Sequence, residues 1–177
     1  MITQTVLPYS EYLLLPEDDH TKYEMLWGEL HMAASPRYRH QDVEIHLGGL
    51  LDRHVRDRGL GAVVGPVDLY RDEMNYVQPD LSYFTTEQAT RLGDAQAIRE
   101  VPLLVVEILS PGTSSHDRVK KRRWYAELCV REYWLADTFA GRVEVIDLAG
   151  GTSRDEDPVR SSVLPELALP LAEIFVP

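Results

Sequence analysis

Apolar and polar positions follow two kinds of period along the chain, and each period predicts a different element. Residues 22–34 alternate on both sides of Trp27 and Gly28, which predicts a tight β-hairpin that turns at these two residues. From Ser35 to Gly59 the apolar residues recur at spacings of three and four, which is typical of one amphipathic helix. Gly59 is a natural end for that helix, because glycine adopts the left-handed conformation without strain.

The remaining segments carry shorter patterns. They predict a short helix capped by Ser10 and stopped by Pro16, and later a partly helical segment over 85–100. They also predict two hairpins, one of residues 61–70 and 75–84 and one of residues 132–139 and 142–148. A strand and a short helix over 163–175 are expected to close the chain. This order predicts an α/β or α+β fold with an N-terminal hairpin, built around one central mixed β-sheet that is flanked by helices. The length of 177 residues and the hydrophobic share of 44% fit a single domain over residues 1–177.

Composition narrows the classes of function. The net charge of −11 argues against a protein that coats nucleic acid by bulk electrostatics, but it leaves room for a local basic patch. No run of about 18 apolar residues occurs, so no membrane span is expected, and the N-terminus lacks the basic region of a signal peptide. Cys129 is the only cysteine, and CxxC and HExxH patterns are absent. We therefore expect a cytoplasmic protein without an internal disulfide or a structural zinc site.

One carboxylate lies in an unusual place in the hydrophobic pattern. Residues 101–109 carry apolar side chains on both alternating faces, which predicts a strand covered on both sides, and Glu107 lies within it. Burying an ionised glutamate costs on the order of several kcal/mol unless a partner compensates it. A structural explanation would be a buried ion pair with an arginine from Arg118 to Arg123, and a functional one would be a bound cation.

A second carboxylate, Asp80, is predicted to lie near Glu107. Pro79 favours an extended chain before it, so Asp80 lies near the start of a strand and shares a face with Ser82 and Phe84. If this strand neighbours the strand of Glu107, the two carboxylates converge, and one proton or one divalent cation relieves their repulsion. Magnesium prefers one or two carboxylates together with water and phosphate oxygens. Alone, Asp80 could be a structural residue, because aspartate is common in turns and at strand entries.

A helix that Ser114 or Ser115 can cap is predicted to follow, ending at Leu128. One of its faces carries an acid, a base and a phenol at positions i, i+4 and i+8, namely Asp117, Lys121 and Tyr125. The helix also holds the densest positive charge of the chain. Its other cations could form a solvated face or contact nucleic-acid phosphates, and the candidates for such contacts are Arg118, Lys120 and Arg122.

Five segments, taken in this order, resemble the Uma-two family of restriction-endonuclease-like proteins, a branch of the PD-(D/E)xK nuclease superfamily. They are YEMLWGEL (23–30), SPRYRHQ (35–41), VQPDLSYF (77–84), LLVVEILSPGTSSHDRVKKRRWY (103–125) and EYWLAD (132–137). The resemblance implies a restriction-endonuclease-like core in which Asp80 is the motif aspartate and Glu107 the motif glutamate. The lysine that the superfamily pattern places two residues after Glu107 is Leu109 here, and Lys121 fits a D-x-x-x-K-x-x-x-Y pattern in the helix instead.

The resemblance also implies a chemistry. Mg²⁺ or Mn²⁺ held by Asp80 and Glu107 would polarise a DNA phosphodiester and activate a water for its hydrolysis. Lys121 would orient that water or stabilise charge in the transition state. We expect DNA as the partner and a homo-oligomer, namely a dimer. Two other classes compete, namely a binding module that has lost catalysis and a structural dimer-forming protein whose acidic pair is satisfied by arginines.

Four further residues are candidates for the active site, namely Glu24, His40, Asp117 and Tyr125. Glu24 and His40 match positions of the family, where Glu24 could be a further acidic ligand. Glu24 could instead be a surface residue of an edge strand. His40 could be no more than a hydrogen-bonding residue at a helix start.

Overall fold

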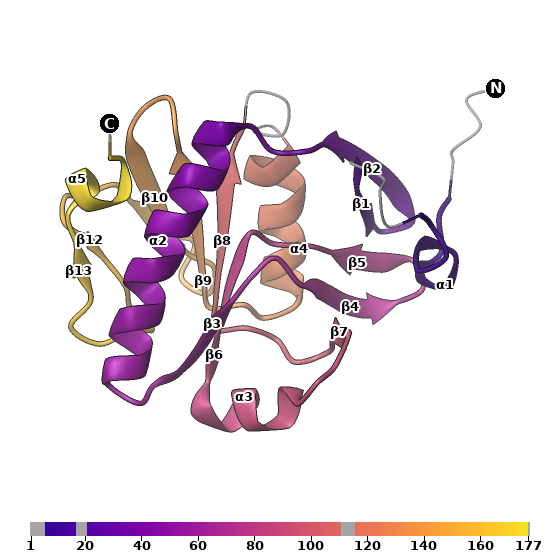
Figure 1. Cartoon of the computed structure of the whole chain (residues 1–177), viewed down its shortest axis with the longest axis horizontal. Helices are drawn as coiled ribbons and strands as arrows, with labels where there is room; N and C mark the ends of the chain where they lie inside the picture. Colours follow the sequence, from indigo (N-terminus) through magenta and orange to yellow (C-terminus); the bar gives the residue numbers. More distant parts are fainter. Residues whose placement is uncertain (1–5, 17–20, 111–115, 177) are drawn as a thin grey trace.

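The computed structural model of the protein describes residues 6–16, 21–110 and 116–176. Its largest sheet has six strands in the order β11-β10-β9-β8-β6-β3 (Figure 1). Their bounds, in this order, are Thr152–Arg154, Arg142–Asp147, Glu132–Asp137, Leu104–Leu109, Leu81–Thr85 and Gly61–Val64. β8 and β9 run parallel and the other neighbours antiparallel, which confirms the predicted mixed sheet.

Helices cover both faces of this sheet. On one face lies α2 (Tyr38–Asp57), whose buried side chains recur at intervals of four, namely Val43, Leu47, Leu51 and Val55. They pack in one core cluster with Leu104, Val106 and Ile108 of β8. On the other face α4 (Arg122–Glu127) packs Trp124 and Tyr125 against the alternate positions of β8, Val105 and Leu109. All six residues of β8 are buried, so the prediction of a strand covered on both sides is confirmed.

A second sheet of five strands, in the order β2-β1-β5-β4-β7, was not predicted from the sequence. Its strands, in this order, are Glu29–Ala34, Thr21–Leu26, Asn75–Val77, Asp68–Asp72 and Ala97–Ile98. β1 and β2 form the predicted N-terminal hairpin. Trp27 and Gly28 turn it with φ values of 50° and 76°, a turn whose twist matches that of the flanking strands.

The hairpin expected over residues 61–84 is divided between the two sheets. β3 pairs with β6 in the large sheet, and β4 pairs with β5 in the smaller one. Pro66 and Pro79 lie between the two pairings and interrupt the ladder, because proline has no backbone N–H to donate. The expectation of two continuous strands is therefore wrong. The break carries the chain from one sheet to the other immediately before Asp80.

The smaller elements follow the predictions except at the two ends of the first helix. α1 (Tyr9–Tyr12) begins after Pro8 and ends at Tyr12, so the expected cap at Ser10 and the expected stop at Pro16 are both wrong. α3 (Thr86–Leu92) confirms the partly helical segment and begins with a capping box of Thr85 and Gln88. β9 and β10 form the expected hairpin. The chain closes with β12, β13 and α5, namely Val159–Arg160, Ala168–Leu169 and Leu171–Ile174.

The helix that follows β8 begins, within the described residues, with a π-helical segment η1 (His116–Lys121) that continues as α4. The cap predicted at Ser114 or Ser115 lies outside the described residues. π-helical turns are rare and occur often at functional sites. Among the helices of the described ranges, none is both long and apolar enough to span a membrane.

Candidate active site

Asp80 and Glu107 lie opposite each other on neighbouring strands. β6 and β8 pair with Leu81 opposite Val106, and the same antiparallel register places Asp80 opposite Glu107, on the face that α4 covers. Only 6% of Asp80 and 2% of Glu107 are exposed. The structure thus brings the two carboxylates to one place, and their catalytic role stays a prediction.

Asp80 is also fixed by the backbone of the neighbouring strand. Its Oδ2 accepts a hydrogen bond of 2.7 Å from the backbone N–H of Ile108. A carboxylate held by a backbone donor keeps its orientation without depending on mobile side chains. Asp80 therefore presents its other oxygen, Oδ1, in a defined direction.

Glu24 comes to this place from the other sheet. It lies on β1, a central strand between β2 and β5, and only 5% of it is exposed. Its Oε1 accepts a hydrogen bond of 3.1 Å from the backbone N–H of Gln78. The alternative of a surface glutamate on an edge strand is therefore wrong, and Glu24 is a third buried carboxylate of the site.

Lys121 is the cation at the centre of these acids. Its Nζ lies 2.9 Å from Glu24 Oε1, 2.9 Å from Glu107 Oε1 and 3.5 Å from Asp117 Oδ1. The Tyr125 hydroxyl donates a hydrogen bond of 2.7 Å to Glu107 Oε1. Asp117, Lys121 and Tyr125 are all buried, so the predicted inward face of this helix exists.

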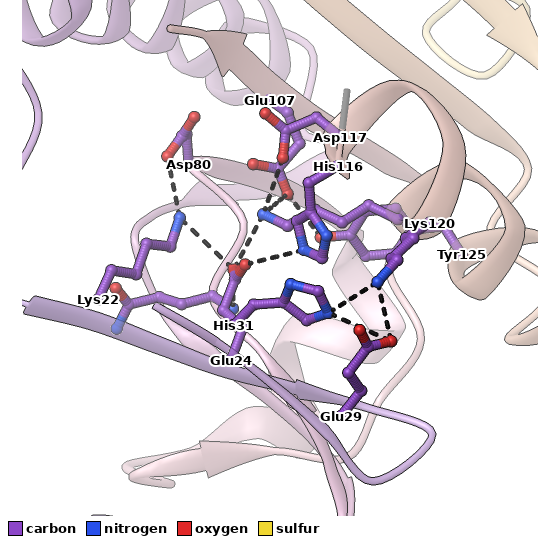
Figure 2. A network of polar contacts seen from close by, with 12 residues as sticks. Lys22, Glu24, Glu29, His31, Asp80, Glu107, His116, Asp117, Lys120 and Tyr125 are labelled. Atoms are coloured by element: carbon purple, nitrogen blue, oxygen red, sulfur yellow. Dashed lines mark hydrogen bonds and ion pairs between the residues drawn. The ribbon is translucent and has the colours of Figure 1, made fainter. Parts of the chain in front are cut away.

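A second lysine, Lys22, joins Asp80 to Glu24, as Figure 2 shows. Its Nζ lies 3.4 Å from Asp80 Oδ1 and 3.6 Å from Glu24 Oε1. On the other side of Asp80, His40 Nε2 lies 3.2 Å from Oδ2. His40 therefore reaches the cluster from the first turn of α2. All seven residues predicted for the catalytic and additional active-site roles belong to this one network.

Burial and charge act in opposite directions on these acids. Burial raises the pKa of Glu107 to about 8, although Lys121 and Lys22 act to lower it. Burial also acts to raise the pKa of Asp80, but Lys22 and His40 outweigh it and lower that pKa to about 2. For Glu24 the two lysines likewise outweigh burial, and its pKa lies well below the usual range. Among these three acids, Glu107 is thus the one whose pKa is raised, and burial is the cause.

The residues predicted to contact phosphates point elsewhere. Arg118 pairs with Glu144 at 2.9 Å and with Asp137 at 3.3 Å, both on the β9–β10 hairpin. Lys120 Nζ lies 2.8 Å from Glu29 at the start of β2. Arg122 is half-buried on the first turn of α4. Within the described residues, neither Arg118 nor Arg122 pairs with Asp80, Glu107 or Glu24, and Lys120 lies at the edge of the network beside Glu29 and His31 (Figure 2).

The alternative in which arginines neutralise Asp80 and Glu107 is wrong, because the residues that pair with these acids are lysines. Within the described part of the chain, the cations beside Asp80 and Glu107 are Lys22, Lys121 and, if protonated, His40. The same described ranges contain no cluster of three or more His, Cys, Asp or Glu side chains arranged to hold a metal ion. Asp80 and Glu107 nevertheless offer the two hard oxygen donors that Mg²⁺ requires from a protein, and the Lys121 ammonium shows that Glu107 accepts a cation.

Comparison with known proteins identifies the relatives of the chain. A model of the Uma2 family, described as "Putative restriction endonuclease", matches residues 9–175. The chain belongs to the Uma2 family. Two proteins of Synechocystis sp. that are described as uncharacterized are similar to it. One is 28% identical over 80% of this chain and 81% of its own length. The other is 31% identical over 76% and 70%.

A solved structure supports the Uma2 fold. It is described as a putative nuclease belonging to DUF820 from Anabaena variabilis. It superposes with a TM-score of 0.80 and covers 96% of this chain and 97% of its own, at 20% sequence identity. At this identity the likeness concerns the fold, and it confirms the predicted restriction-endonuclease-like class for this Uma2 protein.

Two further residues of the network, Lys22 and His116, are not among the site residues predicted from the sequence. Lys22 lies two positions before Glu24, so on an alternating strand both side chains share a face. This spacing could have identified Lys22, had Glu24 been recognised as buried. His116 lies 3.7 Å from Glu24 Oε2 and precedes Asp117. No pattern in the sequence indicates that contact, because it joins segments about 90 positions apart.

Proposed function

We propose that this protein hydrolyses phosphodiester bonds in DNA with the help of a divalent metal ion. The observation that carries the proposal is the buried, cross-strand pair of Asp80 and Glu107. Two carboxylates in one buried place repel each other unless a cation or a proton lies between them. The family of the chain is described as "Putative restriction endonuclease", which favours a nuclease over other metal-dependent enzymes with two carboxylates.

Asp80 and Glu107 would hold Mg²⁺ or Mn²⁺, with Glu24 as a further acid beside them. The bound ion would supply Lewis-acid polarisation of the phosphate and a more acidic water. The chain itself supplies orientation. Tyr125 fixes one oxygen of Glu107, and Lys121 holds Glu107 and Glu24 together.

The phosphate contacts proposed for the substrate are Arg118, Lys120 and Arg122. Arg118 and Lys120 would have to exchange carboxylate partners for phosphates. Such an exchange costs little, because partly exposed ion pairs contribute only about 0–1 kcal/mol. These contacts would give local attraction to a protein whose net charge is −11.

The test is cleavage of plasmid DNA in Mn²⁺ by the wild-type protein and by Asp80→Asn. We expect the wild type to bind Mn²⁺ in isothermal titration calorimetry and to nick the plasmid. Asp80→Asn should lose most of the Mn²⁺ binding and most of the nicking activity, because it removes one of the two proposed metal ligands. Asp57→Asn, at the exposed end of α2, is the matched control and should behave as the wild type.

Other outcomes decide against the proposal. DNA binding without cleavage at any divalent metal would indicate a binding module that has lost catalysis. A wild-type protein that neither binds Mn²⁺ nor cleaves DNA would indicate that the lysines have a purely structural role. Cleavage of RNA but not DNA would reassign the substrate and leave the metal site in place.

A further inference from the structure

Two of the three lysines of the chain lie in the carboxylate network, and their surroundings differ. The side chain of Lys121 is 2% exposed, and its Nζ lies within 3.5 Å of three carboxylates. An ammonium has three N–H donors. Glu24, Glu107 and Asp117 therefore account for every donor of Lys121, and no face of it is open to a substrate.

Lys22 contacts fewer carboxylates than Lys121, and at longer distances. Its two carboxylate contacts, at 3.4 and 3.6 Å, are longer than the 2.9 Å contacts of Lys121. Its side chain is 22% exposed. In Figure 2 it approaches the network from the Asp80 side, away from Lys120 and Tyr125. At least one N–H of Lys22 therefore remains available to an incoming anion.

The surface next to Lys22 suits an anion. His40, which contacts Asp80 from the first turn of α2, has a side chain that is 12% exposed. Directly before it on the chain, Arg37 and Arg39 are exposed and form no ion pair with any described residue. These arginines thus lie at the same helix start as His40, and Asp80, the partner of His40, is also the partner of Lys22.

We propose that Lys22 is the lysine that contacts the scissile phosphate, and that Lys121 positions the carboxylates. This inference rests on the proposed nuclease function. In the reaction a water oxygen bonds to phosphorus, the bond from phosphorus to one sugar oxygen breaks, and a proton from the water ends on that leaving oxygen. Lys22 stays protonated throughout and donates a hydrogen bond to a non-bridging phosphate oxygen, whose charge grows in the transition state.

The position of Lys22 allows this contact without a rearrangement of the fold. Lys22 lies on β1 and pairs with Ala33 of β2, so its backbone is held in the sheet. Its partner Asp80 is one of the two proposed metal ligands. When Asp80 is engaged by another cation, Lys22 keeps its contact with Glu24, and the N–H that faced Asp80 becomes available to the phosphate.

The experiment compares Lys22→Met, Lys22→Arg and Lys121→Met with the wild type on duplex DNA in Mn²⁺. We expect Lys22→Met to lower kcat by about 10²- to 10³-fold, in the range for loss of one transition-state donor. KM should change little, the melting temperature should fall less than in Lys121→Met because Lys22 is 22% exposed, and Lys22→Arg should recover part of kcat. Arg53→Met, on the exposed side of α2, controls for loss of one positive charge.

Lys121→Met should give a different pattern. It leaves Glu24 and Glu107 without their shared cation, so the melting temperature should fall markedly before any rate is measured. If Lys121→Met does not fold, the Lys22 variants still decide the question. A wild type that cleaves DNA together with a Lys22→Met protein of unchanged kcat overturns the assignment and leaves the nuclease function intact. A wild type that neither binds nor cleaves DNA in Mn²⁺ refutes both.

Discussion

Among the single residues of the site, Glu107 is the acid whose ionised form is most disfavoured by burial. It is 2% exposed, and burial raises its pKa to about 8 even though Lys121 lies 2.9 Å away. A folded-state pKa above the unfolded value means that the folded protein binds the proton more tightly. The stability that this proton contributes is complete below about pH 4.5 and is lost as the pH rises through about 8.

Replacing Glu107 with Gln should remove the loss of stability that the wild type shows at high pH. Glutamine does not titrate, and it can still accept the Tyr125 hydroxyl, so the fold should stay intact in metal-free buffer. We expect the free energy of unfolding of the variant to exceed that of the wild type at pH 9 by on the order of a few kcal/mol. Urea denaturation at pH 6 and pH 9 measures the difference, with exposed Glu11→Gln as the control. A strongly destabilised Glu107→Gln protein would show that the ion pair with Lys121 is structural.

Among the elements, the start of α2 provides positive charge, from Arg37 and Arg39, that is paired with no carboxylate of the described residues. Its first turn contains no acidic residue, and Arg37 and Arg39 are exposed. Replacing both with Ala should weaken DNA binding and lower the slope of log K against log salt by roughly two, about 0.9 for each phosphate that is no longer neutralised. Fluorescence anisotropy over a salt series measures this slope. The matched pair Arg53→Ala and Arg58→Ala, at the far end of the helix, should leave it unchanged.

At the scale of the whole molecule, the same network joins the two sheets. Glu24 belongs to the five-stranded sheet, and Glu107 belongs to the six-stranded one. Lys121 contacts both carboxylates. Where the two sheets meet, a polar cluster thus replaces part of an apolar core, and its charge state affects the stability of the whole fold.

Acid should therefore weaken the protein through this junction. The pKa of Glu24 lies well below its usual range, and that of Asp80 is about 2. A carboxylate with a depressed pKa contributes stability that is present above its unfolded value near pH 4 and is lost as the pH falls through the folded value. We expect the free energy of unfolding to fall between about pH 4 and pH 2. Denaturation followed by circular dichroism measures this free energy at each pH. Glu24→Gln should make the free energy of unfolding less dependent on pH, whereas Glu11→Gln should not.

Features that depend on neighbours along the chain could be predicted from the pattern of residues. The run from Leu104 to Leu109 is apolar on both faces, so a buried strand with Glu107 inside it follows from composition alone. The spacing of apolar residues in α2 and the Trp27-Gly28 turn are local in the same sense. The family resemblance, which rests on motifs in a fixed order, gave the fold class.

Which distant groups meet became visible in the folded chain and not in the pattern of residues. The sequence pattern predicted one hairpin over residues 61–84, and the structure divides it between two sheets, which is how β1 comes close to β8. The burial of Glu24 and the place of Lys22 follow from that division, because their contacts lie more than 50 positions away. Local periodicity reports which face of an element is apolar, but it contains no information on which other element covers that face. The exposure and the contacts of Lys22 and Lys121 therefore follow from the folded chain and not from the sequence pattern.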